Sequence, residues 1–146
     1  MTTDEVLERD DRPTARPGRC HQAETWYEPT SLAPVAGRRF VRAMLELWHA
    51  DDLCDVAELL TSELVTNVVR HAATPVSLAL RWDVPRLRVA VGDGSPTLPV
   101  VATRATLGGG YGLRLVTRLA TDWGVTPTPE GKVVWFVLDR EESARA

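Results

Sequence analysis

The chain has 146 residues, of which 44% are hydrophobic and 25% are charged, and its formal net charge is −3. A chain of this length can bury the core of one domain without a disulfide or a structural metal, and its small negative charge argues against a nucleic-acid-binding protein, which needs a basic face. The N-terminus is polar and acidic, and no apolar run reaches the roughly 18 residues that span a bilayer. We therefore expect a cytoplasmic protein without a membrane or nucleic-acid partner.

The expected domain covers residues 22–140. Residues 1–21 are rich in Asp, Arg, Pro and Thr and carry almost no large apolar side chains, so this segment cannot bury enough surface to offset its ordering entropy. We expect a disordered N-terminal tail over 1–21 and a short C-terminal tail over 141–146.

The two cysteines, Cys20 and Cys54, are far apart in the sequence. They fit free thiols in a reducing compartment, because neither belongs to a paired motif. A metal site built from Cys20, His21 and His49 is an alternative, although these residues have no recognised metal-ligand spacing.

The first half of the domain shows a strand and two amphipathic helices. Apolar residues recur at helical spacing between positions 35 and 48 and again between 56 and 68. The expected elements are an edge strand over 23–28, a helix over 32–48 with Thr30 or Ser31 as its N-cap, and a helix from a cap at Asp51 or Asp52 to about His71.

The hydrophobic period changes to two in the second half of the domain. The expected elements are strands over 75–82 and 87–91, a long loop over 92–110, a helix over 111–123, and strands over 123–128 and 132–138 joined by a turn at 129–131. Two hairpins and few crossovers predict an α/β (α+β) two-layer sandwich, in which a mostly antiparallel mixed sheet is covered on one face by three helices.

The second helix carries Glu63, Asn67 and His71 at four-residue spacing. Steps of about 100° a residue place them on one narrow stripe of an otherwise apolar segment. A solvated helix edge explains His71 near the helix end, whereas polar groups beside a core need partners. A carboxylate and an amide carbonyl on adjacent turns can hold a hard cation with its waters, and the carboxylate can also activate a hydroxyl.

Two further segments have the composition of a ligand site. Asp93 ends an apolar strand and can accept a hydrogen bond from an exocyclic amine, while Gly94 permits close approach of a flat ring, although Asp-Gly is also a common turn. The run GGGYGL over 108–113 directly precedes a helix. Converging N–H groups and a helix N-terminus suit phosphate, and a flexible loop with a cap is the alternative.

The order of these features resembles that of the GHKL (Bergerat-fold) ATPases, which include histidine-kinase catalytic domains and type II topoisomerase ATPase domains. Their N box is similar to SELVTNVVRHA, their G1 box to a shortened VGDGSP and their G2 box to GGGYGL. Within this superfamily the chain most resembles the anti-sigma-factor serine/threonine protein kinase group of actinomycete type, through LLTSELVTNVVRHA, GLRLVTRLATDWGV and GKVVWFVL. The resemblance covers about residues 23–140 and implies ATP and Mg²⁺ as cofactors.

By this resemblance, Asn67 ligates Mg²⁺ between the phosphates, and Glu63 is the general base that takes a proton from a serine hydroxyl or a water. Asp93 binds the adenine amino group, and Gly94 lies beneath the ring. The glycine motif along the phosphates consists of Gly108, Gly109, Gly110, Tyr111, Gly112 and Leu113. In this family the kinase phosphorylates a serine of a STAS-type anti-anti-sigma protein and sequesters a sigma factor.

The chain departs from the family pattern in three places. Val133 stands where the family often has Thr, which removes a polar contact toward adenine. Tyr111 stands where many relatives carry Arg near the γ-phosphate, and Arg104 or Arg114 could substitute for that charge. The G1 box also lacks a second glycine beyond Gly94.

These residues leave four hypotheses. Glu63 favours a serine/threonine protein kinase that is also an anti-sigma factor. Tyr111 and Val133 favour an ATP-binding switch module of the same fold, which sequesters a partner without efficient phosphotransfer. The third hypothesis is a detached histidine-kinase catalytic domain, but the sequence contains no helical hairpin with a phosphoacceptor histidine. The fourth is an α/β scaffold that does not bind ATP, which leaves the order of the motifs unexplained.

A homodimer is a further expectation from the family. Trp26, Tyr27, Phe40 and Trp48 could supply an apolar face for it. Packing in the core is the simpler use of these side chains.

Overall fold

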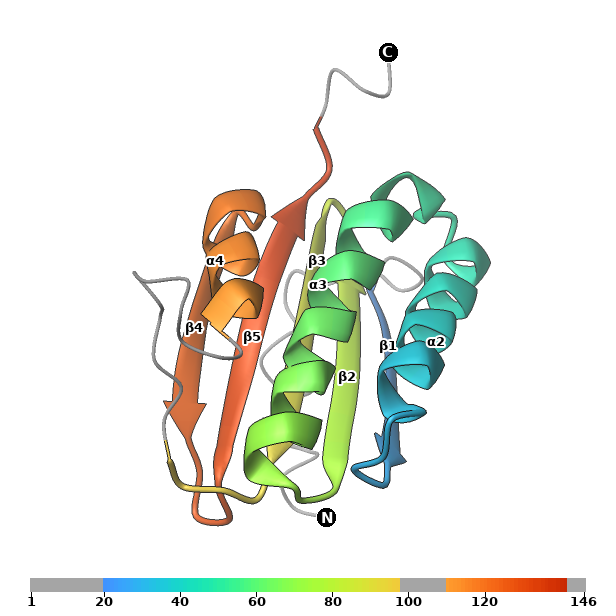
Figure 1. Cartoon of the computed structure of the whole chain (residues 1–146). Helices are drawn as coiled ribbons and strands as arrows, with labels where there is room; N and C mark the ends of the chain where they lie inside the picture. Colours follow the sequence, from blue (N-terminus) through green and yellow to red (C-terminus); the bar gives the residue numbers. More distant parts are fainter. Residues whose placement is uncertain (1–19, 98–109, 142–146) are drawn as a thin grey trace.

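The computed structural model describes residues 20–97 and 110–141 of the chain. Five strands form one sheet, and three α-helices lie on one of its faces (Figure 1). The elements are β1 (Cys20–Tyr27), α2 (Ala33–Leu47), the 3₁₀ turn η1 (Asp51–Leu53), α3 (Cys54–Asn67), the π-helical turn η2 (Val68–Ala72), β2 (Val76–Asp83), β3 (Arg86–Asp93), α4 (Gly110–Leu119), β4 (Asp122–Pro127) and β5 (Lys132–Asp139).

The sheet has the strand order β1-β2-β3-β5-β4, and all four pairings are antiparallel. Side chains alternate between the two faces of a strand. One face forms a continuous buried layer under the helices, which contains Val76, Leu78, Leu80 and Trp82 of β2, Leu87, Val89 and Val91 of β3, and Val134, Phe136 and Leu138 of β5. The opposite face is not covered by any described helix.

The predicted two-layer fold is confirmed, and its sheet is antiparallel throughout the described strands. Residues 20 and 21, which the sequence assigned to the tail, belong to β1. The last helix was predicted to reach Trp123, but it ends at Leu119. The cause is sheet pairing, because the Thr121 N–H donates to the Val137 carbonyl and Trp123 pairs with Phe136.

Both predicted helix caps are wrong. The cap of α2 is Leu32, and no side chain bonds to the first turn. Thr30 instead accepts a 3.2 Å hydrogen bond from the Leu32 N–H. Asp51 and Asp52 lie in η1, which separates them from the start of α3. Because neither α2 nor α3 has a side-chain N-cap, these two helices are held by packing on the sheet more than by their ends.

The aromatic residues proposed for a dimer mostly serve the core. Tyr27, Phe40 and Trp48 pack against it, and the Tyr27 hydroxyl donates to the Ala36 carbonyl. Trp26 is 64% exposed on the uncovered face of the sheet. The oligomeric state stays a prediction.

The cysteines and histidines do not form a metal site. No group of three His, Cys, Asp or Glu side chains that could hold a metal ion occurs in the described residues, and His21 stacks on Trp48 with the ring centroids 5.5 Å apart. Burial raises the pKa of the Cys54 thiol to about 11, so this thiol is protonated at neutral pH. Within the described ranges, no helix has the length and hydropathy needed to cross a membrane.

The turn between β4 and β5 packs against the end of β3. Thr128 and Gly131 close this turn through backbone hydrogen bonds of 3.0 and 3.2 Å, and the Thr128 hydroxyl accepts another from the Gly131 N–H. A β-carbon on Gly131 would overlap the carbonyl oxygen of Asp93 and come within 2.7 Å of the Gly94 backbone. Residue 131 therefore has to lack a side chain for the turn to lie on the strand end.

Replacing Gly131 by Ala is expected to destabilise the fold by about 1–3 kcal/mol, the usual cost of overpacking. The control is Gly37→Ala in α2, where a β-carbon would meet side-chain atoms at an ordinary 3.6–3.7 Å and where Ala is the better helix former. Thermal unfolding should show a lower melting temperature for Gly131→Ala and an equal or higher one for Gly37→Ala. Equal melting temperatures of Gly131→Ala and the unmodified protein would contradict the close approach.

Candidate functional site

Glu63 and Asn67 lie on the flank of α3 that faces away from α2. The α2 side of the helix is marked by Glu58, which forms an ion pair with Arg42 of α2. At about 100° a residue, Glu63 lies about 140° and Asn67 about 180° round the helix from Glu58. Since α3 lies between α2 and α4 and contacts both (Figure 1), the two polar residues belong to the α4 side.

Both of these polar residues are half-buried. Neither side chain makes a hydrogen bond or an ion pair with another described residue. Polar groups at the margin of a core are usually partnered, so Glu63 and Asn67 are available to water or to a ligand. Whether they contact a nucleotide stays a prediction.

The helix that carries Asn67 continues as the π-helical turn η2. Its C-cap is Ala73, whose φ of 54° and ψ of 37° are left-handed. The chain then returns to the sheet, and the Thr74 hydroxyl accepts a 2.8 Å hydrogen bond from the Gly94 N–H. This contact joins the loop between η2 and β2 to the residue that follows β3. His71 lies exposed within η2, where the α-helical stripe that links Glu63 and Asn67 no longer continues.

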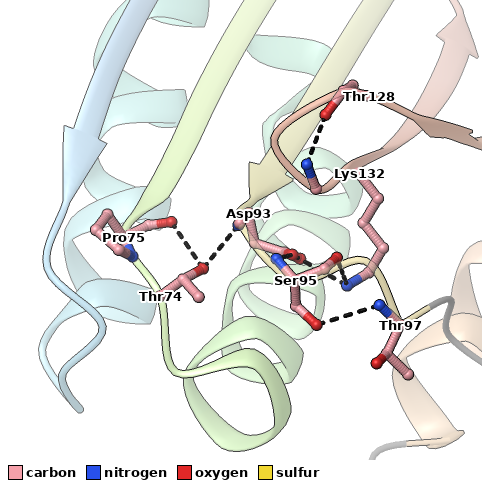
Figure 2. A network of polar contacts seen from close by, with 9 residues as sticks. Thr74, Pro75, Asp93, Ser95, Thr97, Thr128 and Lys132 are labelled. Atoms are coloured by element: carbon pink, nitrogen blue, oxygen red, sulfur yellow. Dashed lines mark hydrogen bonds and ion pairs between the residues drawn. The ribbon is translucent and has the colours of Figure 1, made fainter.

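The Asp93 carboxylate is the centre of a polar network at the end of β3 (Figure 2). Its Oδ1 accepts a 2.8 Å hydrogen bond from the Ser95 N–H and a 3.0 Å charge-assisted bond from the Lys132 ammonium. The side chain is only 2% exposed, and its strand position places it on the helix-covered face with Val89 and Val91. No described residue donates to Oδ2.

Lys132 is a residue of this site that the motif analysis missed. It is the first residue of β5, lies directly opposite Asp93 in the β3–β5 pairing, and is 9% exposed. Its ammonium also donates to the Ser95 carbonyl over 3.2 Å. The sequence does not show which face Lys132 occupies, because residues 133–138 are apolar throughout. In the structure it shares its face with the buried Val134, Phe136 and Leu138, where a charged residue is unusual.

The interpretation of Val133 changes for the same reason. Val133 pairs with Gly92 and Thr126, so its side chain points to the uncovered face of the sheet. Asp93 points to the other face. The hydroxyl that the family often carries at this position therefore would not lie on the Asp93 side, and Lys132 supplies the polar group there.

The glycine motif is only partly described. Gly108 and Gly109, and also Arg104, lie outside the described residues. Gly110, Tyr111 and Gly112 form the first turn of α4, and Leu113 is buried in the core. A helix that begins directly after a glycine run presents free backbone N–H groups to an anion.

These parts gather at one end of the molecule. Figure 1 shows the C-terminal ends of α3 and β3 and the start of β5 at the same end, and the first turn of α4 is nearer to it than the last. The donors and acceptors there fit a nucleotide: a carboxylate with one open oxygen for a base, a helix start for phosphate, and an amide. An amide alone does not hold Mg²⁺, which takes most of its oxygens from phosphates and water.

The chain is similar in structure to two solved proteins. The RsbU and RsbW domains of Rv1364c from Mycobacterium tuberculosis align with a TM-score of 0.63 and 16% sequence identity, which covers 82% of this chain and 32% of that chain. The histidine kinase domain of a blue-light activated histidine kinase from Erythrobacter litoralis is 26% identical with a TM-score of 0.46, over 61% of this chain and 45% of that chain. The first similarity shows a shared fold, and this chain spans about a third of the length of that structure.

No curated protein matches the chain. A protein family does match, namely the histidine kinase-like ATPase domain, over residues 25–138. This range begins within β1, ends within β5 and contains Glu63, Asn67, Asp93 and Lys132. The chain therefore belongs to the family of histidine kinase-like ATPase domains, as the predicted resemblance to GHKL ATPases implied.

Proposed function

We propose that the protein binds ATP with Mg²⁺ and acts as a serine/threonine protein kinase and anti-sigma factor, whose substrate is a STAS-type anti-anti-sigma protein. The observation that carries this proposal is the flank of α3 with Glu63 and Asn67. Both side chains are half-buried on the α4 side and lack partners among the described residues. Their helix continues through η2 to the loop in which Thr74 bonds to Gly94.

The base would be held at the end of β3. Asp93 accepts a hydrogen bond from the exocyclic amine of adenine through Oδ2, because Oδ1 already receives two donors. Gly94 lies beneath the ring, where it offers no side chain to obstruct it. The Thr74 hydroxyl fixes the Gly94 N–H and so keeps this backbone in place for the base.

The phosphates would lie between α3 and the start of α4. Asn67 would contribute an oxygen to Mg²⁺, and the backbone N–H groups of the glycine motif, of which Gly108 and Gly109 lie outside the described residues, would bind the phosphates. The bound nucleotide would supply the phosphoryl group and leave as ADP. Transfer of this group depends mainly on positioning and on neutralising charge, and Glu63 takes the proton from the attacking serine hydroxyl.

The partners are proposed from the family group that the motifs resemble. A similar fold is present in a structure that contains an RsbW domain, and the sequence of the second helix resembles that of the anti-sigma kinase group. An anti-sigma factor has to release its sigma factor when its state changes, and ATP is a suitable ligand for coupling two such states.

A second candidate is an ATP-binding switch without efficient phosphotransfer. The observation in its favour is Tyr111, which stands where many relatives carry a positive charge near the γ-phosphate. Both candidates need the same nucleotide site. They differ only in whether Glu63 transfers a proton during a reaction.

Binding of ATP with Mg²⁺ should raise the melting temperature, because a ligand that binds only the folded state stabilises it by about 2.7 kcal/mol at 100 times its dissociation constant. Asn67→Ala should lose the difference between ATP with Mg²⁺ and ATP with a chelator, since the metal loses a protein ligand. Gln22→Ala on β1 is the control and should keep that difference. If millimolar ATP does not shift the melting temperature of the unmodified protein, the proposed nucleotide site is wrong.

Glu63→Gln should bind ATP as the unmodified protein does but transfer phosphate to a STAS partner at least about 100-fold more slowly, the typical contribution of a general base. The measurement is transfer from labelled ATP to STAS proteins encoded in the same genome. Glu24→Gln, on the uncovered face of β1, is the matched control. Undiminished transfer by Glu63→Gln would exclude Glu63 as the base, and absence of transfer by the unmodified protein would favour the switch.

A further inference from the structure

The ion pair between Lys132 and Asp93 does more than neutralise two buried charges at the end of β3. The two side chains are 9% and 2% exposed, and the ammonium lies 3.0 Å from Oδ1 of the carboxylate (Figure 2). A buried pair of this kind is costly to assemble compared with apolar packing. Its position, in the segment that would hold the base of a nucleotide, points to a role in recognition.

The pair still has hydrogen-bonding capacity. A lysine ammonium has three N–H donors, and the described residues use two of them, one to Asp93 and one to the Ser95 carbonyl. The carboxylate has two oxygens, and only Oδ1 receives donors from described residues. One donor and one acceptor therefore remain side by side at the end of β3.

Adenine has the complementary edge. Its exocyclic amine is a donor, and the adjacent ring nitrogen N1 is an acceptor. We propose that Lys132 contacts the base directly, with its ammonium donating to N1 of adenine while Oδ2 of Asp93 accepts from the amine. This inference rests on the proposed function and adds a specificity-determining residue to it.

The same arrangement rejects guanine. Guanine has an acceptor in place of the amine and a donor N–H at N1, so each group of the pair would face a group of its own kind. Sites that hydrogen-bond a base leave buried groups unpaired when the wrong base enters, and this mismatch is the main source of discrimination.

A purely structural role for Lys132 makes a different prediction. If Lys132 only neutralised Asp93, replacing it would weaken the binding of all purine nucleotides by the same factor. If Lys132 donates to N1, replacing it would weaken the binding only of those nucleotides that have this nitrogen. An analogue that lacks N1 therefore separates the two roles.

The experiment measures the dissociation constants of ATP, 1-deaza-ATP and GTP, each with Mg²⁺, for the unmodified protein, Lys132→Met and Lys132→Arg. In 1-deaza-ATP a C–H replaces N1. The unmodified protein should bind ATP roughly 10- to 100-fold more tightly than 1-deaza-ATP, the range for a hydrogen bond to a charged group. This preference should fall to within about 3-fold in Lys132→Met and be partly retained in Lys132→Arg, which keeps a charged donor.

A second measurement uses the unmodified protein and does not depend on the folding of any variant. Lys132 is the only lysine of the chain, so protein labelled with ¹⁵N-lysine gives one side-chain ammonium resonance. ATP should shift this resonance and slow its proton exchange, and 1-deaza-ATP should do so far less.

The outcomes separate the two proposals. If the unmodified protein binds no ATP, the nucleotide site itself is wrong. If it binds ATP and 1-deaza-ATP equally, or if Lys132→Met keeps the full preference for ATP, then ATP binding stands and the contact between Lys132 and the base is overturned. Identical responses of the ammonium resonance to both nucleotides would overturn it as well.

Discussion

The end of the sheet depends on one buried charge pair, between the Lys132 ammonium and the Asp93 carboxylate. Each charge is acceptable in this position only because the other is there. The pair fixes the register of β3 against β5 at their last and first residues, and the Ser95 N–H and carbonyl bond to the same two groups. The β3 end, the β4–β5 turn and the segment after Asp93 thus form one polar unit beside the helix layer.

Most of the fold was accessible from the sequence, because hydrophobic period and turn residues determine it locally. Buried and less buried residues alternate along β2, and the helices show apolar stripes. The errors lie where tertiary contacts override local preference. The last helix stops at Leu119 because the following residues pair with β5, and η2 replaces α-helical geometry directly after Asn67, neither of which a helical pattern can show.

The candidate site was accessible only in part. Glu63, Asn67 and Asp93 could be selected because polar residues interrupt apolar segments. Lys132 could not be selected by motif, since its importance depends on which residue lies opposite it in the sheet, and pairing between β3 and β5 joins positions 39 residues apart. Val133 was misread for the same reason: only the orientation of the strand shows which of two adjacent side chains points toward Asp93.

The contact between Gly131 and the backbone of Asp93 also limits how such a domain can diversify. A larger residue at 131 would lift the turn from the strand and carry its neighbour Lys132 away from the carboxylate. If Lys132 contacts the base as proposed, a domain of this design that binds another nucleotide would have to change at 132 while glycine persists at 131. Pro129 and Glu130 are exposed at the tip of the same turn, so substitutions there would not alter that contact.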